Sequence, residues 1–143
     1  MKTVVALAAR VLVVALAVSF AAEAGEAKKN EEADPLAKFG DEKLADIGFC
    51  FQKFCEAVAA KDAKTAAAFI TDMPRGLAQL DLKKDADKAS FLKYVAGFEG
   101  AQLVSSHRIA IGGIGEVTYT TKAGKEQKQR MQNCGGRWKL TGL

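Results

Sequence analysis

The spacing of apolar residues changes from a helical to an alternating pattern near residue 100, and this change constrains the fold most. Before it, apolar residues recur every three or four positions and form one helical stripe: Leu44, Ile47, Phe51, Phe54 and Val58. After it, short alternating segments at 102–111, 115–121, 126–133 and 137–140 are separated by glycine-containing turns. Helices followed by an antiparallel meander predict an α+β fold: three N-terminal helices packed on a curved antiparallel sheet of about four strands.

Three helices are expected before the strands. Asp41 can cap the first, which runs to Lys61-Asp62. The second covers 63 to about 70 and is rich in alanine. The third runs from about 84 to 98, with Leu92, Val95 and Phe98 facing inward, and Gly100 ends it.

Strict alternation predicts which strand residues share a face. In the first strand the covered face should carry Leu103, Ser105, His107, Ile109 and Ile111. In the second strand Val117 and Tyr119 should point inward together. In the third, Gln127, Gln129 and Met131 share a face that is not strongly apolar. We expect this strand to be a charge-protected edge; the alternative is one wall of a polar pocket.

The N-terminus has the parts of a secretory signal peptide. Lys2 and Arg10 precede an apolar run from 11 to 22, and Ala22-Glu23-Ala24 offers small residues for cleavage after Ala24, with Ala27 as second choice. The apolar run is shorter than the roughly 20 residues that span a bilayer. We therefore predict residues 1–24 to be a signal peptide and the protein to be exported, to a periplasm or outside the cell. A membrane association is expected only if the signal stays uncleaved.

The remainder is predicted to be one domain behind a linker. Residues 25–40 are polar and should form a flexible tether, and residues 41–143 the folded domain. The chain holds 21 Lys and Arg against 17 Asp and Glu, without a basic cluster. Because nucleic-acid binding needs a concentrated basic surface, we expect no nucleic-acid partner.

The chain has three cysteines, Cys50, Cys55 and Cys134, and the sequence leaves open whether two of them form a disulfide. Cys50 and Cys55 lie about 140° apart on one helix, too far to bridge each other, so a disulfide would join one of them to Cys134. The alternative is that they are small buried hydrophobic residues. A zinc site is a weak alternative, because the chain has one histidine and no Cys-x-x-Cys. We expect no metal and no cofactor.

Single side chains suggest chemistry only weakly. His107, the one histidine, would be a general base if a carboxylate faced it, but a structural role is favoured. Tyr119 and Trp138 would be either pocket walls or core residues. Phe49 lies off the helical stripe and would be exposed or part of a dimer contact. No nucleophile elbow, metalloprotease motif or phosphate loop occurs.

The element order resembles the nuclear transport factor 2-like superfamily, also called the SnoaL-like or cystatin-like α+β cone. The resemblance covers about residues 41–143 and rests on Phe51-Gln52-Lys53-Phe54, Lys61-Asp62-Ala63, Val117-Thr118-Tyr119, and the closing run 133–140 with its Gly-Gly-Arg-Trp turn. It implies a pocket between the long helix and the sheet, and domains that often form homodimers through their sheets. The candidate pocket residues are Phe51, Phe54, His107, Tyr119, Gln129 and Trp138.

Members of that superfamily bind ligands in the pocket, catalyse isomerase, dehydratase or cyclase reactions there, or fill it, so fold alone does not choose a function. Our first hypothesis is a non-enzymatic exported domain that binds a small molecule or a protein partner in its cone. The second is an isomerase- or dehydratase-type enzyme using His107 with Tyr119 or an acidic residue. The third is an envelope accessory or assembly module whose cone is filled by its own side chains.

Overall fold

The computed structural model describes residues 33–143, apart from the side chain of Ala110. The expected signal peptide and residues 25–32 of the expected tether lie outside the described residues. The helical elements in chain order are η1 (Ala37–Phe39), α2 (Asp41–Leu44), α3 (Ile47–Ala59), α4 (Ala63–Ala68), α5 (Arg75–Ala78), α6 (Asp85–Tyr94) and η2 (Ala96–Phe98). The strands are β1 (Gln102–Ala110), β2 (Ile114–Thr120), β3 (Glu126–Cys134) and β4 (Arg137–Leu140).

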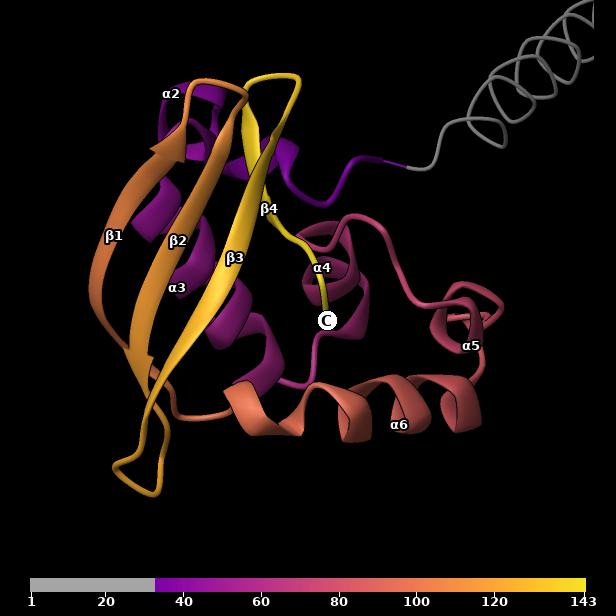
Figure 1. Cartoon of the computed structure of the whole chain (residues 1–143). Helices are drawn as coiled ribbons and strands as arrows, with labels where there is room; N and C mark the ends of the chain where they lie inside the picture. Colours follow the sequence, from indigo (N-terminus) through magenta and orange to yellow (C-terminus); the bar gives the residue numbers. More distant parts are fainter. Residues whose placement is uncertain (1–32) are drawn as a thin grey trace, which may run out of the picture. The chain divides into compact units, whose positions relative to one another are not determined.

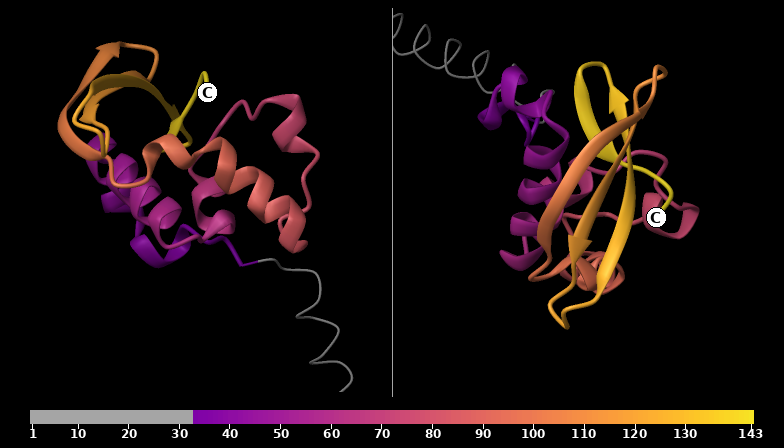
Figure 2. Two further views of the ribbon diagram at one scale, coloured as in Figure 1. Left: turned by 90° about the horizontal axis from the view of Figure 1, so that it is seen from below. Right: turned by 60° about the vertical axis from the view of Figure 1, so that its left-hand side comes forward.

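The strands form one antiparallel sheet in the order β1-β2-β3-β4, and the sheet curves around α3 (Figures 1 and 2). Helices first and an antiparallel meander afterwards confirm the predicted α+β fold. The three expected helices correspond to α3, α4 and α6. The short helix α5 was not expected, and α2 covers the start of the first expected helix.

The first expected helix is broken between α2 and α3. Asp46 has an extended backbone, and its side-chain oxygen accepts a hydrogen bond from the Phe49 N–H at 2.9 Å, so Asp46 is the N-cap of α3. Asp41 instead lies inside the first turn of α2. The prediction that Asp41 caps the long helix is wrong, because a second carboxylate closer to the apolar stripe provides the cap.

The domain begins before residue 41. Leu36 is 1% exposed and belongs to the main core. Phe39 packs edge-on against Phe49, with ring centroids 5.8 Å apart, and also against Phe69. Residues 35–40, which we expected in the tether, therefore belong to the folded domain, because the apolar side chains of Leu36 and Phe39 pack in and against the core. The contact with Phe39 leaves Phe49 half-buried, whereas we expected Phe49 to be exposed or part of a dimer contact.

The faces of β1 differ from strict alternation. The pairing of β1 with β2 shifts between Leu103 and Ser105, and again between Arg108 and Ala110, so that each site inserts one extra residue. Leu103 lies opposite inward-facing Tyr119, but after the first shift His107 lies opposite Glu116 on the outer face. The expected covered face of this strand is therefore wrong beyond Leu103, and Ile109 and Ile111 are 50% and 108% exposed.

The free edge of the sheet is β1, not β3. β3 lies between β2 and β4, and its inner face buries Met131 and Gln129. At the other side of the sheet, the segment Phe69–Thr71 runs beside the end of β4: Leu140 N–H donates to Phe69 O at 2.7 Å, and Thr71 N–H donates to Leu140 O at 2.8 Å. The expectation that β3 is an edge is wrong because its mixed polarity reflects a buried glutamine on the inner face.

Candidate functional site

The space between α3 and the sheet is filled by aromatic side chains. Phe51 lies 5.0 Å from Tyr119 and 6.2 Å from Phe98 between ring centroids, and Phe54 lies 5.1 Å from Phe98. Phe51 and Phe54 are fully buried, and Tyr119 is nearly so. These expected pocket residues therefore form the core, at the ring separations typical of packed aromatics.

Trp138 is also a core residue. Its side chain is 1% exposed, and its indole N–H donates to the carbonyl of Ala45 at 3.0 Å. This hydrogen bond satisfies the one polar atom of the ring and ties β4 to the segment between α2 and α3. The residue is brought inward, as expected, and nearly all of its surface is packed in the core.

Gln129 fixes the end of the chain. Its side-chain amide donates to the carbonyls of Thr141, at 2.7 Å, and Arg130, at 2.9 Å. The Thr141 N–H donates in turn to Arg130 O at 3.1 Å, so the last residues continue alongside β3 after β4 ends. A buried amide used in this way is structural, although Gln129 also lines a small polar hollow of about 290 Å³ beside the last residues of the chain.

His107 and Tyr119 lie on opposite faces of the sheet and cannot act on one substrate. Glu116, directly opposite His107, does supply the carboxylate that the sequence did not reveal, but it forms an ion pair with Lys128 at 3.4 Å on the solvent-facing side. The enzyme hypothesis that joined His107 to Tyr119 therefore has no geometric support.

The three cysteines are unpaired. Burial raises the pKa of the Cys55 thiol to about 12 and that of the Cys50 thiol to about 11, with smaller increases from the carboxylates of Glu56 and Asp46 respectively. The Cys50 thiol also donates to Leu44 O at 3.2 Å. These values keep both thiols protonated at neutral pH, so neither is a nucleophile. The expected bond to Cys134, which is half-buried at the end of β3, is absent from the structure.

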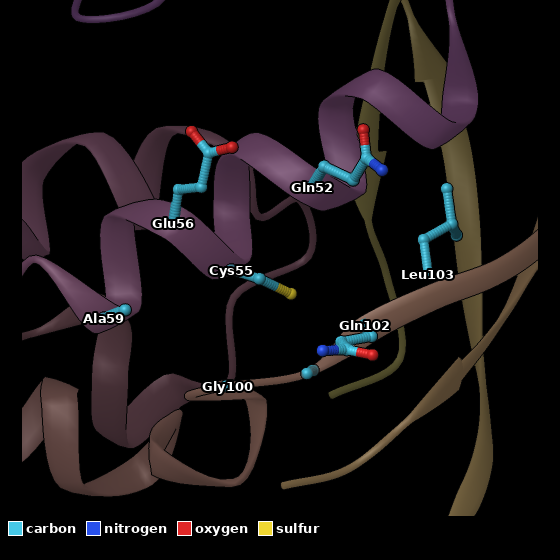
Figure 3. Close-up of a pocket in the computed structure, with 8 residues that line it drawn as sticks. Gln52, Cys55, Glu56, Ala59, Gly100, Gln102 and Leu103 are labelled. Carbon is cyan, nitrogen blue, oxygen red and sulfur yellow. The ribbon is translucent and has the colours of Figure 1, made fainter.

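A groove of about 420 Å³ lies between α3 and the start of β1. Figure 3 shows that the Cys55 sulfur points from α3 toward the strand, with Gln52 on the helix side and Gln102 and Leu103 on the strand side. The other lining residues are Glu56, Ala59, Gly100 and Ala101. Gln52 and Gln102 are both exposed, so two side-chain amides are available above a neutral, mostly buried thiol.

The groove has hydrogen-bonding groups but no reactive set. Glu56, which points away from the strand in Figure 3, is held by Lys53 at 2.7 Å. Among residues 33–143, no group of three or more His, Cys, Asp or Glu side chains could hold a metal ion, and no helix is long and apolar enough to cross a membrane. The sequence did not reveal this groove, because Gln52 and Gln102 line the same groove only after the chain has turned at Gly100.

One wall of the groove is an unpaired strand edge. β1 is the outermost strand on its side, so alternate backbone N–H and C=O groups along it have no partner strand within the described part of the chain. A strand edge next to a helix is the arrangement into which extended peptides add as a further strand.

Comparisons with known proteins identify no family for the chain. No protein-family model and no curated protein matches the sequence. A solved structure from Xanthomonas campestris, described as a calcium/calmodulin dependent protein kinase II association domain, is similar over 65% of this chain and 82% of that chain. The two share 12% sequence identity with a TM-score of 0.29. A likeness this weak carries no conclusion about the fold or the function.

Proposed function

We propose that the chain is a non-catalytic binding module of the nuclear transport factor 2-like type that captures an extended segment of a protein partner in the groove between α3 and β1. The main support for this proposal is that the open edge of β1 lies beside the side-chain amides of Gln52 and Gln102. Backbone hydrogen bonds to β1 would supply affinity, and the two amides would select polar side chains.

Two further observations support a proposal of binding at the surface over catalysis in the interior. Phe51, Phe54 and Tyr119 occupy the interior that a cone enzyme would use for its substrate. The one titratable side chain at the floor of the groove, Cys55, stays neutral because burial raises its pKa. The proposal is thus closest to the hypothesis of an accessory module with a filled core.

The test is selection of peptides from a random library displayed on phage, followed by mapping of the binding site by NMR. A bound peptide should shift the amide resonances of 102–108 and 52–59, and should slow hydrogen exchange along β1. Ala59→Trp, at an exposed position that lines the groove, should block binding by filling it. Ala89→Trp, at an exposed position of α6, is the matched control and should bind as the original chain does.

Enrichment of no peptide, or resonance shifts confined to the outer face of the sheet, would refute the groove as the binding site. Equal loss of binding in Ala59→Trp and Ala89→Trp would do the same. The homodimer expected from the resemblance stays a prediction, separate from this experiment.

Export is part of the proposal, supported by the pattern of residues 1–24. N-terminal sequencing of the protein recovered from outside the cytoplasm should begin at Gly25, the residue after Ala24. A product that keeps Met1 and stays in the membrane fraction would show instead that the apolar segment is an anchor.

A further inference from the structure

A second hollow, separate from the groove, lies where the β1–β2 hairpin meets the end of β3. Its volume is about 780 Å³, and it is lined by Arg108, Ile109, Ile111, Gly113, Asn133 and Trp138. None of these residues lines the groove between α3 and β1. The proposed function does not use this hollow.

The polar part of the hollow consists of hydrogen-bond donors. The Arg108 guanidinium lies over the indole of Trp138, 5.6 Å from the ring centroid, and no carboxylate among residues 33–143 forms an ion pair with it. The side-chain oxygen of Asn133 accepts from the Gly136 N–H at 2.8 Å. That bond fixes the orientation of the amide and leaves its NH₂ group to donate elsewhere.

The rest of the lining is apolar and open to solvent. Ile109 is 50% exposed and Ile111 is 108% exposed, although large aliphatic side chains are usually buried. They are two of the four large hydrophobic residues that are exposed in the described part of the chain; the other two, Tyr94 and Val104, do not line the hollow. Exposed apolar side chains gathered beside a polar site often mark a binding surface.

We propose that this hollow binds an apolar carboxylate, meaning a carboxylate joined to a branched aliphatic or aromatic group. The carboxylate would accept hydrogen bonds from Arg108 and Asn133, and the apolar group would cover Ile109 and Ile111. No acidic residue lines the hollow, so its charge complements an anion. Such a group can come from a free small acid or from the C-terminal residue of a peptide.

Trp138 is the only tryptophan of the chain, so its fluorescence reports on the hollow directly. The probes are 4-phenylbutyrate with its primary amide, and the tripeptide Gly-Ile-Leu, acetylated at its N-terminus, with a free or an amidated C-terminus. Binding should change Trp138 emission and the Ile111 amide resonance saturably. Each carboxylate should bind at least about tenfold more tightly than its amide, because the amide lacks the charge-assisted hydrogen bonds.

Binding of phenylbutyrate identifies a free acid as the ligand class, and binding of the tripeptide alone identifies a chain terminus; either supports the proposal. Arg108→Gln should weaken carboxylate binding at least about tenfold, judged by the Ile111 resonance. Arg130→Gln, which changes an exposed arginine of β3 away from the hollow, is the matched control and should change binding less than about twofold.

Two outcomes would overturn the proposal. One is the absence of saturable binding by either carboxylate; the other is an equal loss of binding in Arg108→Gln and Arg130→Gln. Arg108 belongs to β1 but does not line the groove between α3 and β1, and peptide capture is judged by Ala59→Trp, which does not line the hollow. Failure of either experiment is therefore distinguishable from failure of the other.

Discussion

At the scale of single residues, the polar side-chain atoms in the core form hydrogen bonds. The indole N–H of Trp138 bonds to the backbone of Ala45, and the Gln129 amide bonds to Thr141 and Arg130. No buried side-chain nitrogen or oxygen among residues 33–143 lacks a hydrogen bond. Removing either side chain would therefore leave a part-buried backbone carbonyl without its side-chain donor, and this lowers stability.

Trp138→Phe should lower the free energy of unfolding by about 2–3 kcal/mol, because it removes buried ring volume and leaves the Ala45 carbonyl without its donor. Urea unfolding followed by far-UV circular dichroism measures the change. Tyr94→Phe, at an aromatic residue that is 50% exposed, is the control and should change stability by less than about 0.5 kcal/mol. Similar losses in both variants would contradict the structural role of Trp138.

The buried thiols should make stability fall at alkaline pH. Folding raises the pKa of Cys50 to about 11 and of Cys55 to about 12, from about 9 in the unfolded chain. The unfolded chain therefore releases these protons first, so the contribution to stability is complete below about pH 9 and is lost as pH rises toward 12. Each thiol adds a slope of at most about 1.4 kcal/mol per pH unit.

Urea unfolding at pH values from about 7 to about 10 tests this slope. Cys50→Ala combined with Cys55→Ala should flatten it, whereas Cys134→Ala should leave it unchanged. A steep alkaline loss that persists in the double variant would assign the effect to other groups.

At the scale of elements, helix ends and strand bulges decide where side chains point. The cap of α3 is a local interaction, since Asp46 bonds to a residue three positions later. The bulges of β1 arise from the way in which β1 pairs with β2, and the sequence of β1 alone does not show them. Helical periodicity therefore predicted α3 well, while strict alternation misplaced His107.

Asp46→Ala should lower stability by about 1 kcal/mol through loss of the N-cap. Asp41→Ala should lower it by less than about 0.5 kcal/mol, because the Asp41 carboxylate is exposed and makes only a 3.4 Å contact with Arg137. Thermal or urea unfolding of the two variants provides the comparison. A larger loss of stability in Asp41→Ala than in Asp46→Ala would indicate one continuous helix that begins at residue 41.

At the scale of the whole molecule, the sequence predicted the helices-then-meander order because each element carries its own periodicity. It could not predict the filled interior, since Phe51, Phe98 and Tyr119 come from three separate elements whose packing depends on the curvature of the sheet. The groove was equally hidden, because it requires α3 and β1 to lie side by side. The start of the domain was misplaced because a polar composition outweighed two apolar residues, Leu36 and Phe39.

Leu36→Ala in the full chain should lower the free energy of unfolding by about 2–5 kcal/mol, the range for truncating a buried leucine. Val104→Ala, at a residue that is 57% exposed, is the matched apolar control and should cost less than about 0.5 kcal/mol. Chemical denaturation monitored by Trp138 fluorescence gives both values. A negligible effect of Leu36→Ala on the free energy of unfolding would indicate that residues 35–40 are not part of the folded domain.

The two sides of the sheet differ in a way that limits assembly. The end of β4 is already occupied by Phe69–Thr71, whereas β1 is open. A second copy that adds to β1 through its own β1 would cover the open β1 edge of both chains. We expect such pairing to be complete after two chains, so that association through β1 would give closed pairs and not fibres.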